Sequence, residues 1–115
     1  MRVIENVISD RGSRYAVAGG SARSAEEAKA FVKELCRNKK FARATHNTWG
    51  LLLESGPVKN DDGESGAGLV ICRMLEREGL FDTVVVVTRW YGGKHLGGDR
   101  FRHVQEAVRV WLAEA

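Results

Sequence analysis

The sequence predicts an α+β fold, a two-layer sandwich in which a four-stranded sheet carries three helices in the order β-β-α-β-α-β-α. Three observations support this prediction. Residues 83–87 are a β-branched run that is typical of a buried strand. Other segments repeat apolar residues at helical spacing, and turn-forming residues separate them. Because amphipathic helices bury their apolar stripe, we expect them to cover one sheet face and to leave the other face, or its rim, for contacts.

The chain is expected to begin with a β-hairpin and a helix. Residues 3–8 and 13–17 are the predicted strands, and Asp10-Arg11-Gly12 between them has typical turn chemistry. Ser24-Ala25-Glu26-Glu27 is a capping box, in which the serine accepts from a helix amide and the second glutamate reaches back. The helix is expected to end near Arg37, with apolar residues on one face and lysines on the other.

A third strand and a second helix are predicted next. The strand covers residues 45–53, and Ser55-Gly56-Pro57 is expected to break it. Residues 60–66 then form a polar loop. The second helix is expected to start near Gly66 to Gly68, and Gly79 is placed as its C-terminal glycine.

The strand at residues 83–87 leads into residues 88–101, a glycine-rich crossing from strand to helix. The last helix is expected to run from about Arg100 to Ala113, with Asp99 as its N-cap. Glycine permits positive φ and the close approach of other groups. The crossing is therefore either a shaped concavity for a partner or two tight turns before a helix, and the sequence leaves both interpretations open.

Length and composition limit the classes of protein to consider. The 115 residues suffice for one domain, and 43% hydrophobic with 29% charged residues is ordinary for a soluble globular protein. No apolar run approaches the ~20 residues of a membrane span, and the N-terminus has no secretory pattern. Cys36 and Cys72 match no metal or redox motif. We therefore expect a reduced, cytoplasmic protein that does not contact a membrane.

Three polar segments carry the residues suited to chemistry: residues 44–47, residues 61–64 and the crossing at 88–101. We expect them to converge at one end of the sheet if the strand at 83–87 neighbours the strand at 45–53. None of these segments has the spacing of a metal motif or of a nucleotide-binding glycine loop. We therefore expect no metal and no nucleotide cofactor.

The acidic segment has two interpretations. In one, Asp61, Asp62 and Glu64 act with His46 in an uncharacterised hydrolase, where close carboxylates shift one another's pKa. In the other, these carboxylates cap the second helix and pair with an arginine of residues 88–101.

A basic run and an aromatic pair are features that can indicate binding to nucleic acid. The basic face comprises Lys29, Lys33, Arg37, Lys39, Lys40 and Arg43. It either follows a phosphate backbone or is a solvated helix face. Arg89-Trp90-Tyr91 places a cation beside two aromatic rings, which can stack on unpaired bases. The alternative is that Trp90 packs in the core and Arg89 pairs with the acidic segment.

Taken together, these motifs resemble the IMPACT/YigZ family. The motifs are, in order, Phe41-Ala42-Arg43-Ala44-Thr45-His46-Asn47, Asp61-Asp62-Gly63-Glu64, Val86-Val87-Thr88-Arg89-Trp90-Tyr91-Gly92-Gly93, Leu96-Gly97 and Asp99-Arg100-Phe101. The ordered set covers the chain from about Ser13 onwards. Residues 98–103 are closer to the eukaryotic IMPACT form than to bacterial YigZ.

The resemblance implies a fold like the second domain of ribosomal protein S-five and domain IV of elongation factor G. It implies one IMPACT N-terminal-type domain over residues 1–115, without the RWD or ferredoxin-like domains of other members. We expect a non-enzymatic binding module that regulates translation through RNA, the ribosome or a translation-associated protein. The resemblance implies a binding patch made of His46, Asn47, Asp61, Asp62, Gly63, Glu64, Arg89, Trp90, Tyr91, Gly92, Gly93, Gly97, Asp99 and Arg100.

Overall fold

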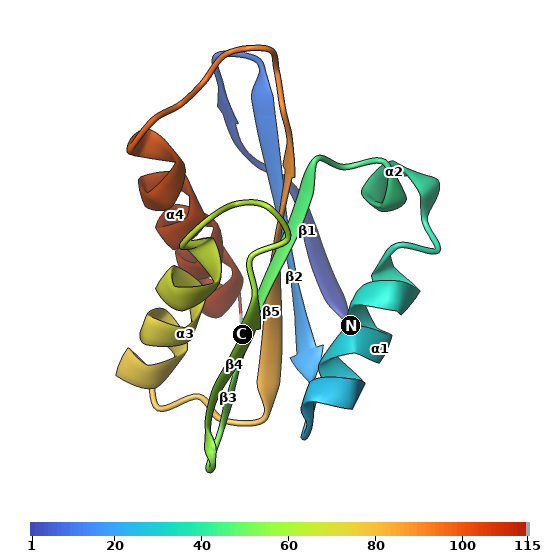
Figure 1. The fold of residues 1–115 in the computed structure, drawn as a ribbon, viewed down its shortest axis with the longest axis vertical. Coiled ribbons are helices and arrows are strands. Elements are labelled where there is room, and N and C mark those ends of the chain that lie inside the picture. Colours follow the sequence, from blue (N-terminus) through green and yellow to red (C-terminus); the bar gives the residue numbers. More distant parts are fainter. Residues whose placement is uncertain (115) are drawn as a thin grey trace.

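The protein folds around an antiparallel sheet that lies between two pairs of helices (Figure 1). The structure is a computed structural model and describes residues 1–114. Its elements are β1 (Arg2–Asp10), β2 (Ser13–Ser21), α1 (Ala25–Leu35), α2 (Lys39–Ala42), β3 (His46–Leu53), β4 (Gly56–Asn60), α3 (Ala67–Arg77), β5 (Thr83–Trp90) and α4 (Asp99–Ala113). The strand order in the sheet is β1-β2-β5-β3-β4, with every neighbouring pair antiparallel.

The predicted α+β class is confirmed, but residues 1–114 form five strands and four helices instead of four and three. The additional strand is β4, which starts at Gly56, where the sequence predicted only a break. Because β4 is a short strand at the sheet edge, it tolerates Pro57, a residue that normally argues against a strand. The additional helix, α2, is a single turn started by Asn38, whose side-chain oxygen accepts from the amide of Lys40 at 3.0 Å.

The expectation that the helices cover one face of the sheet is wrong. In Figure 1, α3 and α4 lie on one side of the sheet, and α1 and α2 lie on the other. The valine run explains the difference, because successive side chains of a strand point to opposite faces. Val85 and Val87 pack in the core beneath α3 and α4, whereas Val84 and Val86 pack in the core beneath α1. A continuous apolar run, without alternation, is the pattern of a strand that is buried on both faces.

The predicted helix starts have different outcomes. The capping box is confirmed, since Ser24 Oγ accepts from the amide of Glu27 at 3.1 Å, although Glu27 reaches back to the amide of Arg23. Asp99 is not the N-cap of the last helix. It is the first residue of α4, Gly98 precedes it, and its carboxylate binds arginines.

The two outer strands of the sheet are both irregular. The register between β1 and β2 shifts between Ile4 and Ile8, and Asn6 within this stretch has a φ of 54°. At the opposite edge, Pro57 of β4 has no amide hydrogen. Among residues 1–114, no helix combines the length and the apolar sequence that crossing a bilayer requires.

Candidate functional site

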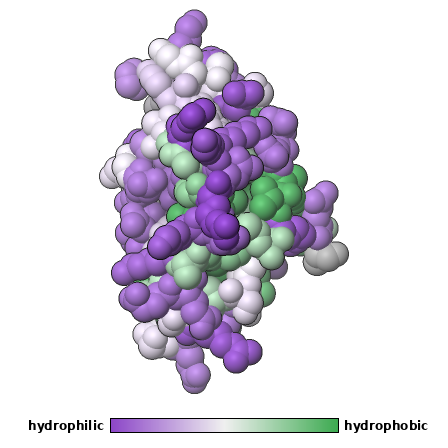
Figure 2. All heavy atoms as spheres, turned by 90° about the vertical axis from the view of Figure 1, so that its right-hand side faces the viewer, coloured by the Kyte–Doolittle hydropathy of each residue, from purple (hydrophilic) through white to green (hydrophobic). Residues whose placement is uncertain are grey.

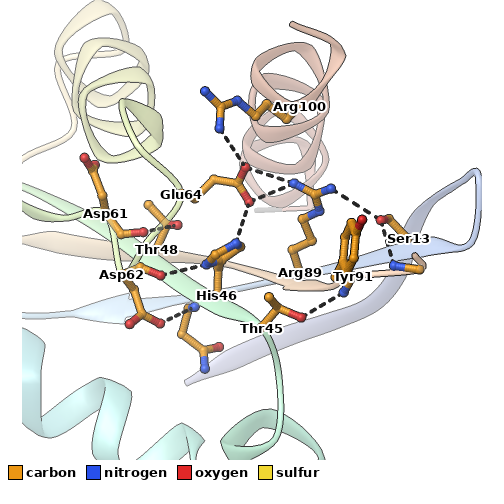
Figure 3. A network of polar contacts seen from close by, with 12 residues as sticks. Ser13, Thr45, His46, Thr48, Asp61, Asp62, Glu64, Arg89, Tyr91 and Arg100 are labelled. Carbon is orange, nitrogen blue, oxygen red and sulfur yellow. Dashed lines mark hydrogen bonds and ion pairs between the residues drawn. The ribbon is translucent and has the colours of Figure 1, made fainter. Parts of the chain in front are cut away.

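The polar segments that the sequence singled out meet at one end of the sheet, as expected. Strand β5 lies between β2 and β3, and the register places Arg89 opposite both Tyr15 and His46. The end of β5 therefore lies beside the beginning of β3, and the segment after β4 closes over both (Figure 3). Antiparallel pairing has brought residues together that are far apart in the sequence.

A buried ion cluster occupies the centre of this end of the sheet. Arg89 and Glu64 are only 6% and 3% exposed, and Arg89 Nη1 donates to both carboxylate oxygens of Glu64, at 2.9 and 3.1 Å. Arg100 Nη1 lies 3.7 Å from Glu64 Oε1, and His46 Nε2 lies 3.6 Å from Glu64 Oε2 (Figure 3). We call these four residues the Glu64 cluster. A hydrogen bond between two ionised groups is stronger than one between neutral groups, and here one guanidinium nitrogen contacts both carboxylate oxygens.

The neighbouring aspartates bind the backbone. The two carboxylate oxygens of Asp61 accept from the amides of Gly66 and Gly68, at 3.0 and 2.8 Å, and so start α3. Burial raises the pKa of Asp61, but these two amides and the charge of Lys59 together outweigh burial, and the net shift of the pKa is downwards. Asp62 Oδ2 accepts from the amide of Asn47 at 2.7 Å. The carboxylates thus have the local structural role that was one of the two interpretations.

His46 and Asn47 are held by the same segment and by α2. His46 Nδ1 lies 2.8 Å from the carbonyl oxygen of Asp62. The side chain of Asn47 is buried, donates to the carbonyl of Phe41 at 3.0 Å and accepts from Thr88 Oγ1 at 2.7 Å. Gly63 has a φ of 86°, and a Cβ there would lie 3.0 Å from the imidazole of His46. Within residues 1–114, no three His, Cys, Asp or Glu side chains gather as metal ligands.

The two aromatic residues at the end of β5 have different environments. Trp90 is half-buried, its indole nitrogen donates to the carbonyl of Lys40 at 3.0 Å, and its ring packs edge-on against Phe41. Trp90 therefore joins α2 to the sheet. Tyr91 is 43% exposed, and its amide donates to Thr45 Oγ1 at 2.9 Å.

The glycines of the crossing serve turns and close packing. The amide of Gly92 donates to Ser13 Oγ at 3.1 Å, and its α-carbon lies so close to Gly12 that a Cβ would come within 2.0 Å of the Gly12 carbonyl carbon. Gly93 and Gly97 have positive φ values of 94° and 56°. These observations fit the interpretation of two turns before a helix.

Asp99 belongs to a second ion cluster, which joins α4 to the β1–β2 turn. Arg11 Nη2 donates to Asp99 Oδ2 at 2.6 Å and to Asp10 Oδ2 at 3.0 Å, and His103 Nε2 lies 2.7 Å from Asp10 Oδ2. The structure therefore separates Asp99 from the Glu64 cluster, although the sequence placed both in one patch. The hydrogen bonds from Arg11 and then His103 lower the pKa of Asp10 from 3.8 to about 2.

The depressed pKa of Asp10 gives a prediction for stability against pH. Because the folded pKa lies below the ordinary value, the charged form favours folding; this stabilisation is complete above the ordinary value and is lost as the pH falls through about 2. Asp10→Asn is therefore expected to lower the melting temperature at about pH 5 and to have almost no effect near pH 2. Thermal unfolding followed by circular dichroism measures this difference. An equal loss at both pH values would contradict the prediction.

The α2 part of the basic face lies beside this end of the sheet, whereas α1 begins at the opposite end, where the amide of Ala22 binds the carbonyl of Asp82. Lys29 and Arg37 pair with glutamates of α1, and Lys40 pairs with Glu5. Within residues 1–114, Lys33, Lys39 and Arg43 form no ion pair with a carboxylate. Figure 2 shows this side of the molecule, on which hydrophilic side chains cover most of the surface around a smaller apolar patch. Trp90 joins the end of β5 to α2 only, through the carbonyl of Lys40.

Sequence reasoning missed two residues of this region. Ser13 Oγ accepts from the amide of Gly92 and lies 3.5 Å from Arg89 Nη2. Arg14 is exposed and lies opposite Trp90 in the register. Both stand at the start of a predicted strand, and only the pairing of β2 with β5 reveals their position.

The comparisons with known proteins agree with the motifs. Residues 11–112 match the model of the Impact N-terminal domain. The Protein IMPACT homologs of Caenorhabditis elegans and Schizosaccharomyces pombe are each 35% identical over 94% of this chain, covering 45% and 41% of their own lengths. Protein IMPACT of Bos taurus is 34% identical over 93% of this chain and is covered over 36% of its length. The chain thus spans less than half the length of these relatives.

Two solved structures have a similar fold. One, described as a hypothetical protein, superposes with a TM-score of 0.81 at 24% identity, over 97% of this chain and 57% of that protein. The other, the two-domain translational regulator Yih1, superposes with a TM-score of 0.55 at 29% identity, over 94% of this chain and 44% of that protein. The family match, which covers most of the chain, agrees with the resemblance in the motifs. The chain belongs to the Impact N-terminal domain family.

Proposed function

We propose that this chain is a non-enzymatic module that regulates translation by binding RNA, in the first instance RNA of the ribosome. Support comes from its family and from its likeness to a structure described as a translational regulator. Because the chain spans less than half the length of that regulator, the activity of the whole regulator is transferred here as a proposal. The exposed charges among the described residues 1–114 give further support.

The observation that carries this proposal is the orientation of the charges at the end of the sheet. The carboxylate of Asp61 accepts from backbone amides, and the carboxylate of Glu64 pairs with a buried and a half-buried arginine. Lys39, Arg43 and Arg14, by contrast, are exposed on the α2 side. Asp62 is exposed as well, but its Oδ2 accepts from the amide of Asn47. The excess of outward-facing cations on the α2 side suits a phosphate backbone, whereas a hydrolase would need a carboxylate that is free to act on a substrate.

Binding to ribosomes and to RNA tests the proposal directly. The chain is expected to sediment with ribosomes at low salt and to leave them as the salt concentration rises, because phosphate contacts release counterions. A titration of labelled single-stranded and duplex RNA across salt concentrations is the companion measurement. If the chain neither sediments with ribosomes nor binds RNA at low salt, and instead captures a protein of the translation machinery, the proposal is wrong.

Neutralising the basic face is expected to change the salt dependence of binding. Lys39→Gln and Arg43→Gln each remove one cation of the proposed phosphate path, so each is expected to lower the slope of log K against log salt by about 0.7 on single-stranded RNA. Arg73→Gln is the matched control, because Arg73 is an exposed arginine of α3, on the other side of the sheet. The same slope in all three variants would place the RNA elsewhere.

A further inference from the structure

Tyr91 has an exposed aromatic ring at the end of β5, where the sheet gives way to the crossing. Its side chain is 43% exposed, although neighbouring Trp90 is half-buried and its indole nitrogen is already bonded. An aromatic ring left open to solvent beside cations is a common feature of surfaces that bind a flat ligand. Tyr91, and not Trp90, is thus the available ring.

The position of Tyr91 is fixed by its backbone. Its amide donates to Thr45 Oγ1 at 2.9 Å, and the amide of Gly92 donates to Ser13 Oγ at 3.1 Å (Figure 3). Gly92 is also packed against the backbone of Gly12. The segment is therefore anchored on both β2 and the segment before β3, and a ring held in place in this way loses little conformational entropy when a ligand stacks on it.

The surroundings of the ring indicate the chemistry of the ligand. The guanidinium carbon of Arg89 lies 5.7 Å from the centre of the Tyr91 ring, but this cation is buried and already paired with Glu64. The exposed imidazole of His95 lies 5.7 Å from the same ring centre, with the two planes inclined by 43°. Lys94, between these two rings in the sequence, is exposed. A flat group that carries a nearby negative charge matches this arrangement, and an unpaired nucleotide has both properties.

We propose that Tyr91 and His95 form a stacking site for one unpaired base of RNA, beside the exposed cation of Lys94. The inference rests on the proposed function and adds to it the class of RNA, which is single-stranded instead of helical. Bases in a duplex are stacked on one another and present no free face, so only an unpaired base can reach Tyr91. Side chains of a protein partner can also stack on the ring, and the experiment separates that case.

The test is a thermodynamic cycle between the tyrosine ring and the bases. Fluorescence anisotropy measures the affinity of the full chain for a labelled single-stranded RNA of about ten nucleotides and for an abasic ribose-phosphate chain of the same length. Tyr91→Ala is expected to weaken binding of the RNA by about 5-fold to 150-fold. The same variant is expected to leave binding of the abasic chain unchanged. Tyr91→Phe keeps the ring and is expected to bind the RNA like the parent chain.

Two further variants make the result specific. His95→Ala is expected to weaken binding of the RNA in the same direction as Tyr91→Ala, without affecting the abasic chain. Phe81→Ala is the matched control, because Phe81 is 51% exposed in the segment just before β5, whereas Tyr91 directly follows that strand. Circular dichroism melting confirms that each variant is folded.

The outcomes distinguish this inference from the proposed function. If the parent chain binds single-stranded RNA and Tyr91→Ala binds it equally well, the stacking site is wrong and the proposed function stands. Equal losses on the RNA and on the abasic chain also overturn the stacking site, because the tyrosine then acts on the backbone or on the fold. If the parent chain binds neither RNA nor ribosomes, and the Tyr91 variant instead loses a protein partner, both proposals fail.

Discussion

Arg89→Met is expected to lower the free energy of unfolding by about 3–5 kcal/mol. The substitution removes the cation whose Nη1 donates to both oxygens of Glu64, a carboxylate that is 3% exposed. Arg100 and His46 remain, but they lie 3.7 and 3.6 Å from this carboxylate and replace the lost pair only in part. A buried charge without adequate partners is among the most destabilising features that a single substitution creates.

Urea unfolding measures this loss as a lower transition midpoint with an unchanged slope. Arg102→Met is the matched control, because the Arg102 side chain is 71% exposed and pairs with Asp99 at 3.0 Å, so its loss is expected to cost at most about 1 kcal/mol. The double variant Arg89→Met with Glu64→Met is expected to recover part of the stability, since it buries no charge at this position. A small effect of Arg89→Met, equal to that of Arg102→Met, would contradict the role of the Glu64 cluster.

Gly92→Ala is expected to lower the free energy of unfolding by about 3 kcal/mol or more. The new Cβ would lie 2.0 Å from the carbonyl carbon of Gly12 and 2.3 Å from the amide nitrogen of Ser13, which are backbone atoms of the β1–β2 turn and of the start of β2. The shift also weakens the hydrogen bond from the Gly92 amide to Ser13 Oγ, which is worth about 1 kcal/mol.

Gly98→Ala is the matched control for Gly92→Ala. Gly98 lies in the same crossing, has a φ of −66°, and has open space where a Cβ would be added. Its substitution is expected to leave stability unchanged or to raise it by about 0.4–1 kcal/mol, because alanine restricts the unfolded chain. Urea unfolding of both variants decides the comparison. If the two variants were equally stable, the turn between β1 and β2 would move easily to make room for the added Cβ, and the prediction would be wrong.

The sequence predicts those features of the fold that depend on neighbouring residues. The start of α1 was predicted from Ser24 and Glu27 because a capping box lies within one helical turn. The prediction that Asp99 is the N-cap of α4 was wrong, because its carboxylate accepts from Arg11, which lies in a turn that is distant in the sequence. Strand β4 was missed because Pro57 is permitted only at a sheet edge, and the position of a strand in a sheet is not a local property.

The candidate site was predictable to a similar extent. The convergence of the polar segments followed from two adjacent strands, and the pairing of acidic residues with Arg89 was one of the two stated alternatives. Ser13 gave no signal of its own, because a serine at the start of a strand is common and its role depends on Gly92, 79 residues away. That both faces of the sheet are covered could have been predicted from the valine run, because apolar and polar residues do not alternate in it.

The irregular outer strands have a consequence for how this molecule meets others. An intact border would offer a ladder of free amides and carbonyls to an incoming strand, and such borders promote fibrous self-association. Here the bend around Asn6 interrupts one border and Pro57 removes a donor from the other. We therefore expect a partner to engage side chains at the end of the sheet, and the protein to resist polymerising through its main chain.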